Sequence, residues 1–192
     1  MLNNFRGSLK PLLEKMGVKF AATGLSPNFW TGVGLGFAFA SAAVYGMNSQ
    51  IQNAAIFGGI LLLISGFFDV VDGQVARATN KVSKKGGFLD SVFDKIAEVA
   101  IFLGIMIGGF ADPILVFLAI TMSLLVSYSR SRAESLGVKL QGIGMGERAE
   151  RLLVIAIIGI AGFMNYAVLI VVIIAAITFI QRIVVTARNI GD

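Results

Sequence analysis

Six long apolar segments recur along the chain and dominate what it can fold into. They run roughly over 28–48, 51–77, 88–110, 112–129, 152–163 and 166–187. A helix needs about 20 apolar residues to cross the hydrocarbon layer of a membrane, and most of these segments approach that length. The chain is 56% hydrophobic and only 14% charged, outside the usual range of soluble domains. We therefore predict an all-α integral membrane protein with six transmembrane helices.

Two details of this six-helix prediction are less distinct in the sequence. The fifth segment, 152–163, is short for a span unless its helix begins near Gly146. The boundary between the third and fourth segments is expected at the Gly, Asp and Pro residues of 108–113.

The basic residues predict how the helices are oriented. All 16 Lys and Arg residues fall before the first segment, around the second and fourth connections, or near the end of the sixth segment. The connections 47–53, 110–113 and 163–166 contain none. By the positive-inside rule, both termini and the second and fourth connections lie in the cytoplasm, with the protein in the cell (plasma) membrane. The net charge of +5 is explained by this topology and gives no support for nucleic-acid binding.

The first 20 or so residues have a different, amphipathic pattern. Apolar residues alternate there with four cations, which suits a helix lying in the lipid headgroup layer. The apolar residues are Leu2, Phe5, Leu9, Leu12, Leu13, Met16 and Phe20. Glu14, Lys15 and Lys19 interrupt the run, so it does not resemble a signal peptide. We predict a single domain over 1–192, with an interfacial helix over 1–25 and a six-span core over 26–190.

Four aspartates stand at the facing ends of the second and third apolar segments. Asp69 and Asp72 are three residues apart and Asp90 and Asp94 are four apart, so each pair shares one helix face. The loop over 78–85 is short, so the two helices are expected to pack antiparallel and to bring the carboxylates together near the cytoplasmic boundary. Four such charges would repel in a low dielectric, and carboxylate oxygens suit Mg²⁺ or Mn²⁺. The pattern predicts a divalent-cation site.

A purely structural role for the aspartates is the alternative. They could cap helices or pair with Arg77, Lys81 and Lys95. Carboxylates inside a membrane are costly and usually functional, so we favour metal ions that clamp a pyrophosphate. Gly73 and Ala76 would leave the same helical turn open to a base or sugar, and Arg77 offers a guanidinium to a phosphate. The chain has no Cys and no His, which removes thiolate chemistry and the usual general base.

The aspartate pairs belong to a longer motif. It reads Asp69-x-x-Asp72-Gly73-x-x-Ala76-Arg77, eight residues, then Gly86-x-x-x-Asp90-x-x-x-Asp94. This resembles the complete signature of the CDP-alcohol phosphotransferase family of integral membrane enzymes. The resemblance implies transfer of a phosphatidyl-type group from a CDP-linked lipid to an alcohol, with release of CMP. It also implies that all four aspartates line a site for two Mg²⁺ or Mn²⁺ ions and that Asp94 is the base. Asp72, Gly73, Ala76 and Arg77 would bind the CDP moiety.

Arginines gather near the cytoplasmic ends of the last three segments. They are Arg130, Arg132, Arg148, Arg151 and Arg182. A dianionic phosphate on the acceptor would need such a cluster to offset its desolvation. The alternative is ordinary positive-inside anchoring with local Arg/Glu pairs.

Three short stretches extend the resemblance to one branch of the family. They are Tyr128-x-Arg130-x-Arg132-Ala-Glu134, Glu147-Arg-x-Glu-Arg151 and Gln181-Arg182. These are similar to the inositol-phosphate-using branch, the phosphatidylinositol-phosphate synthases of actinobacteria and their archaeal counterparts. The likeness implies that Arg130, Arg132, Arg151 and Arg182 hold myo-inositol phosphate, with Arg148 a weaker candidate. It also implies CDP-diacylglycerol or CDP-archaeol as the lipid donor, membrane lipids around the spans, and a homodimer.

Two other functions are compatible with parts of this pattern. A sibling enzyme that uses glycerol 3-phosphate would need a similar basic pocket. A divalent-cation transporter could use the aspartates as its transport site. The outer connections and outer halves of the segments carry no acidic residue except Asp112, which disfavours transport.

Overall fold

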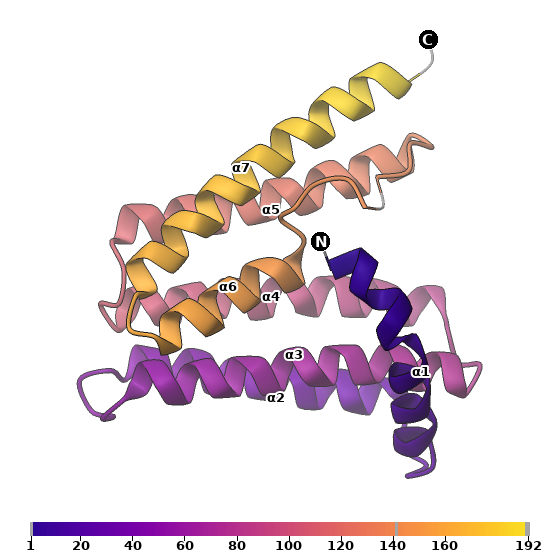
Figure 1. Ribbon diagram of the computed structural model, residues 1–192, viewed down its shortest axis with the longest axis horizontal. Coiled ribbons are helices and arrows are strands. Elements are labelled where there is room, and N and C mark those ends of the chain that lie inside the picture. Colours follow the sequence, from indigo (N-terminus) through magenta and orange to yellow (C-terminus); the bar gives the residue numbers. More distant parts are fainter. Residues whose placement is uncertain (1, 141, 191–192) are drawn as a thin grey trace.

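The computed structural model describes residues 2–140 and 142–190, with side chains from Pro11 onward. Within these residues the chain forms helices and no strands, which confirms the all-α prediction (Figure 1). The helices are α1 (Leu2–Ala21), α2 (Pro27–Gly46), α3 (Ala54–Ala78), α4 (Lys84–Ile107), α5 (Pro113–Ser135), α6 (Arg148–Ile160) and α7 (Met164–Asn189). Leu2, Phe5 and Leu9 of the predicted amphipathic face have side chains outside the described part.

Local capping explains where three of the helices begin. Ser26, Ser83 and Asp112 each accept a hydrogen bond through their side chain from the backbone N–H three residues further on. Such caps satisfy N–H groups that have no partner inside the helix. Pro27 and Pro113 then occupy the first turn, where a missing N–H costs nothing. The boundary predicted at 108–113 is thereby confirmed.

Four helices, α2, α3, α5 and α7, are long and apolar enough to cross a membrane. The other two predicted spans fall short in different ways. Helix α4 carries several charges in its first half, and α6 has 13 residues, which gives a length of about 20 Å against about 30 Å of hydrocarbon. Helix α6 begins at Arg148, close to the start that a longer fifth span required.

The outward faces of the helices are apolar, as expected for contact with lipid tails. Phe117 of α5 is 67% exposed, and Ile157 of α6 and Ile180 of α7 are each 60% exposed. Soluble proteins rarely present so much contiguous apolar surface to water. Together with the four long apolar helices, these faces fit a multi-pass membrane protein.

The connections alternate between the two ends of the bundle. The connection 79–83 and residues 136–140, which follow α5, lie at the right-hand end of the view, near α1 and the end of α7, and residues 142–147 run back from there to the start of α6 (Figure 1). The connections 47–53, 108–112 and 161–163 lie at the opposite end. The helices therefore place the segments rich in Lys and Arg on one side of the molecule.

Helix α2 holds the two aspartate-bearing helices. It packs closely against both α3 and α4, whereas α3 and α4 have few close backbone contacts with each other. A Cβ atom on Gly104 of α4 would collide with the carbonyl oxygen of Ala42 in α2, and Ser65 of α3 donates a 2.8 Å hydrogen bond to the Gly34 carbonyl of α2. Helices α3 and α4 are therefore brought together mainly through α2, with few direct backbone contacts between them. The small residues of α2 let it approach both helices, and this leaves space between the carboxylates.

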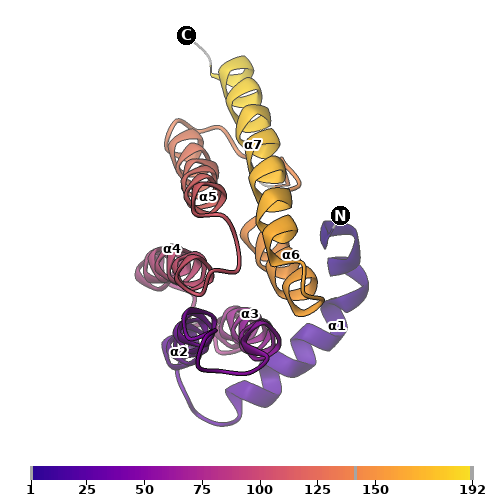
Figure 2. The same ribbon diagram turned by 90° about the vertical axis from the view of Figure 1, so that its left-hand side faces the viewer.

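The remaining helices form a second group beside the first. Figure 2 shows α5 and α7 on one side of the bundle, α2, α3 and α4 on the other, and α6 between them. Helix α6 packs against both α3 and α7. This position brings the first residues of α6 toward the aspartates of α3.

Candidate functional site

Three of the four motif aspartates meet between α3 and α4. Asp69, Asp90 and Asp94 each present one carboxylate oxygen, and these oxygens lie within 4.8 Å of one another. All three side chains are half-buried. Oxygens at this spacing can share a divalent cation, since hard cations prefer several carboxylate ligands.

Asp72 lines the same cavity but lies outside this group of three. The cavity has a volume of about 20 Å³, enough for a water-sized body, and Thr31, Ser65 and Asp69 also line it. Asp72 is only 6% exposed, and its Oδ2 atom has no hydrogen-bond partner among the described residues. A buried carboxylate oxygen without a partner is costly. The donor set and this orphaned oxygen both fit a divalent metal ion.

Arg148, the first residue of α6, reaches across to these carboxylates. Its Nη1 atom lies 2.9 Å from Asp69 Oδ1 and 2.6 Å from Asp94 Oδ1. The guanidinium offsets part of the repulsion between the aspartates. In the sequence Arg148 was only a weaker candidate for the acceptor phosphate. Its place beside the aspartates depends on the packing of α6 on α3, which no local pattern reveals.

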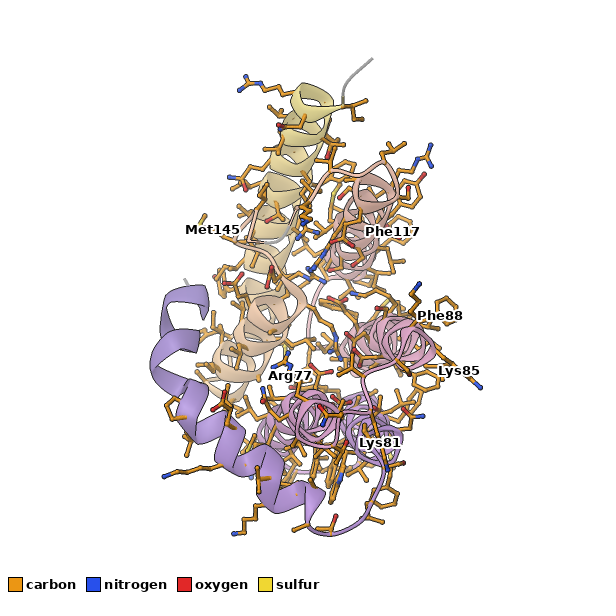
Figure 3. The ribbon with its side chains drawn as sticks, turned by 90° about the vertical axis from the view of Figure 1, so that its right-hand side faces the viewer. Arg77, Lys81, Lys85, Phe88, Phe117 and Met145 are labelled. Atoms are coloured by element: carbon orange, nitrogen blue, oxygen red, sulfur yellow. The ribbon has the colours of Figure 1, made fainter. Side chains whose placement is uncertain are left out.

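The nucleotide-binding positions predicted on α3 follow the aspartates along one stretch of the helix. Gly73 and Ala76 are half-buried and Arg77 is exposed. A Cβ atom on Gly73 would meet nothing within 4 Å, so the space beside this turn is open. Figure 3 shows Arg77 between α3 and α6, whereas Lys81 and Lys85 lie toward the rim of the bundle. Arg77 is thus the motif cation on the side of α3 that faces α6.

Arg151 forms a buried ion pair that the sequence did not suggest. Its Nε and Nη2 atoms donate to Glu98 Oε1 over 2.8 Å and 2.6 Å, and its Nη1 atom donates to the Gly146 carbonyl. Lys95 donates to the other oxygen of Glu98, Oε2, over 2.9 Å. The only advance signal for Glu98 was its position four residues after Asp94, on the same helix face.

The remaining predicted arginines have different surroundings. Arg182 is buried and donates to the backbone carbonyls of Val126 and Ile143 over 2.6 Å and 3.3 Å. Arg130 pairs with Glu134 over 2.9 Å in a largely exposed position. Arg132 is exposed. The structure therefore brings Arg148 and Arg151 to the aspartate face of the bundle and leaves Arg130 and Arg132 near its surface.

The chain is similar in sequence to a known protein family and to several of its members. The model of the CDP-alcohol phosphatidyltransferase family matches residues 25–186. An archaetidylinositol phosphate synthase of Pyrococcus horikoshii is 41% identical over 95% of each chain. A second one, from Methanothermobacter thermautotrophicus, is 37% identical over 96% of this chain and 93% of its own length. A phosphatidylinositol phosphate synthase of Streptomyces avermitilis is 31% identical over 98% of this chain and 84% of its own.

Solved structures with the same fold come from a Mycobacterium tuberculosis phosphatidylinositol phosphate synthase. The form with CDP-DAG bound has a TM-score of 0.78 and 22% identity, covering 92% of this chain and 94% of that one. The complex with manganese and citrate has a TM-score of 0.77, also at 22% identity, covering 91% and 88%. At 22% sequence identity, this structural similarity shows only that the two proteins share a fold.

Proposed function

The chain belongs to the CDP-alcohol phosphatidyltransferase family, and from this premise we propose that it transfers a phosphatidyl-type group from a CDP-linked lipid to myo-inositol phosphate, with release of CMP. One observation carries the proposal. Three of the four motif aspartates fold into one cluster, with the fourth, Asp72, lining the adjoining cavity, in a chain that is 41% identical, over 95% of its length, to an archaetidylinositol phosphate synthase. The activity is that of a transferase in phospholipid biosynthesis.

The aspartates would hold the metal. Asp69, Asp72, Asp90 and Asp94 supply only oxygen donors, which suits Mg²⁺ or Mn²⁺, and their number suits a pair of ions. When bound, divalent ions would neutralise charge on the pyrophosphate and on the departing CMP. The proximity of three carboxylate oxygens and the unpartnered oxygen of Asp72 support this assignment.

Asp94 is proposed as the base of the reaction. The acceptor hydroxyl loses its proton to the Asp94 carboxylate while its oxygen bonds to the phosphorus that carries the lipid. The bond from that phosphorus to the oxygen of the CMP phosphate breaks, and CMP departs with the bonding electrons. Asp72, Gly73, Ala76 and Arg77 would hold the CDP moiety, and the open space beside Gly73 supports a close approach there. Arg77 would pair with a phosphate.

Arg130, Arg132, Arg151 and Arg182 would bind the phosphate of the acceptor. Arg182 and Arg151 are already fixed by backbone carbonyls and by Glu98, so they would contribute the N–H groups that remain unpaired. A guanidinium has five donors, and the bonds described for Arg151 use three of them. A prearranged site costs less ordering entropy when the ligand binds.

We further propose that α4 and α6 complete a six-span core over 26–190, in which α1 lies in the headgroup layer within the single domain 1–192. Phe20 of α1 packs edge-on against Trp30 of α2 at 5.0 Å between ring centroids, which would hold α1 across the bundle. The positive-inside rule places the site and both termini in the cytoplasm, at the plasma membrane. A homodimer through the apolar, glycine-bearing helix faces completes the proposal.

The test is an assay of CMP release. Purified protein receives a CDP-lipid, Mg²⁺ or Mn²⁺, and radiolabelled inositol 3-phosphate, and a parallel reaction receives radiolabelled glycerol 3-phosphate instead. We expect CMP and labelled lipid from inositol phosphate and none from glycerol 3-phosphate. Labelled product from glycerol 3-phosphate alone would assign the chain to the sibling acceptor. Using CDP-diacylglycerol and CDP-archaeol side by side identifies the lipid chain type.

A further inference from the structure

Glu98 lies outside the family motif, yet it is among the most deeply buried charged residues of the described chain. It is 1% exposed and stands one helical turn after Asp94 on α4. Its two carboxylate oxygens have separate tasks. Oε1 accepts both hydrogen bonds from Arg151, and Oε2 accepts the bond from Lys95. Charge-assisted bonds of this kind are strong and directional, so Glu98 fixes the plane of the Arg151 guanidinium.

Arg151 in turn fixes the connection that leads into α6. Its Nη1 atom donates to the carbonyl of Gly146, two residues before α6 begins. Gly146 and Gly144 sit against Thr178 of α7, where a Cβ atom on either glycine would come within 2.7 Å of a Thr178 side-chain atom. Gly144 also has φ +102, a conformation that favours glycine. The connection is therefore held between Arg151 on one side and α7 on the other.

The segment that Arg151 fixes also contacts the aspartates and the predicted acceptor site. Arg148, which contacts Asp69 and Asp94, follows Gly146 by two residues. Ile143 in the same connection accepts a hydrogen bond from Arg182. A shift of Gly146 would thus move Arg148 and disturb Arg182 together.

We propose that Glu98 is a positioning residue for acceptor binding, which acts by orienting Arg151 and the 143–148 segment. The identity of the acceptor in this inference rests on the proposed function. The positioning of Arg151 and the 143–148 segment by Glu98 does not depend on it. Lys95 provides a natural control, because it bonds the other oxygen of the same carboxylate and makes no bond to Arg151. Replacing Lys95 leaves the bonds from Arg151 to Oε1 in place.

The experiment compares the full-length wild type with Glu98→Gln, Glu98→Asp and Lys95→Gln in detergent or lipid nanodiscs. Glu98→Gln removes the charge and keeps the shape. Glu98→Asp keeps the buried charge balanced, so it should fold even if the glutamine variant does not, while its shorter reach loosens the bonds to Arg151. Two readouts are taken: hydrogen exchange of the backbone amides of 143–151, and steady-state kinetics for both substrates.

We expect faster exchange of the 143–151 amides in both Glu98 variants and wild-type exchange in Lys95→Gln. We expect the KM for inositol phosphate to rise about tenfold or more in the Glu98 variants, with the KM for the CDP-lipid changed by less than about twofold. A purely structural defect would not separate the two KM values in this way.

Unchanged exchange in a folded Glu98 variant would overturn the inference, whatever the kinetics. Faster exchange with a wild-type acceptor KM would overturn it as well, as would an equal rise of both KM values. If the wild type itself releases no CMP with inositol phosphate, the proposed function fails, and the exchange data alone decide whether Glu98 positions the segment.

Discussion

The repulsion among the clustered aspartates should make the metal-free protein less stable than a variant with one charge fewer. Asp90 is the most informative site, because Asp69 and Asp94 are paired with Arg148 whereas no ion pair to Asp90 is present among the described residues. The change Asp90→Asn keeps the side-chain shape, removes repulsion with two neighbours, and breaks no ion pair. It also removes one proposed metal ligand.

The magnitude follows from the spacing of the oxygens. Two unit charges at 4.8 Å repel by about 3.5 kcal/mol at an effective dielectric of 20. The three side chains are half-buried, so solvent and salt screening reduce the net gain from removing Asp90 to about 1–2 kcal/mol. For a chain of this size, that corresponds to a rise in Tm of about 2–8 °C in the absence of metal.

The assay is thermal unfolding followed by the fluorescence of the single tryptophan, in EDTA and in Mn²⁺. For the wild type, a metal at 100 times its Kd should add about 2.7 kcal/mol of stability. Asp90→Asn should unfold at a higher temperature in EDTA and gain much less from Mn²⁺. Asp94→Asn is the matched comparison: it also loses a ligand, but it gives up the 2.6 Å pair with Arg148, so its Tm in EDTA should rise less.

The reasoning would be refuted by an Asp90→Asn protein that is less stable than the wild type in EDTA. A wild-type response to Mn²⁺ in this variant would remove Asp90 from the metal site.

Three further predictions concern packing, metal dependence and acceptor binding. Gly104→Val should destabilise the protein by about 1–3 kcal/mol, because its Cβ would collide with the Ala42 carbonyl. Gly36→Ala is the control and should be near neutral, since a Cβ atom there would meet nothing within 4 Å. Thermal unfolding measures the stability of both variants. Chelation with EDTA should abolish CMP release, and excess Mn²⁺ should restore it; full activity after exhaustive chelation would contradict the metal site. Arg132→Ala should raise the KM for inositol phosphate with little change in kcat, and unchanged acceptor kinetics would exclude Arg132 from the pocket.

Local features of the fold were predictable because they depend on interactions over a few residues. The helix starts at Ser26 and Asp112 follow from capping side chains and the prolines beside them. Helix α4 begins earlier than the apolar segment predicted from 88, because Ser83 caps it. The apolar segments gave the order of the helices, and the spacing within each aspartate pair placed its members on one face. The length of α6 was less predictable, since its polar first turn continues directly into the apolar segment.

The arrangement of the candidate site could be predicted from the sequence only in part. The sequence predicts that four aspartates meet, but the structure groups Asp69, Asp90 and Asp94 and sets Asp72 beside them with a free oxygen. The separation of α3 from α4 depends on how closely α2 approaches each of them. That approach arises from small residues on three helices, which no single periodic pattern encodes.

By itself, then, the sequence determined the membrane class, the order of the helices and the helix faces that carry the acidic motif residues, because hydrophobic length and helical periodicity are properties of short contiguous stretches. Only the tertiary structure decided which cations those acids meet. Arg148 pairs with Asp69 across 79 positions of the chain and Arg151 with Glu98 across 53. Such pairs form where packed helices bring charges together at low dielectric, so their partners are set by the packing of α6 against its neighbours.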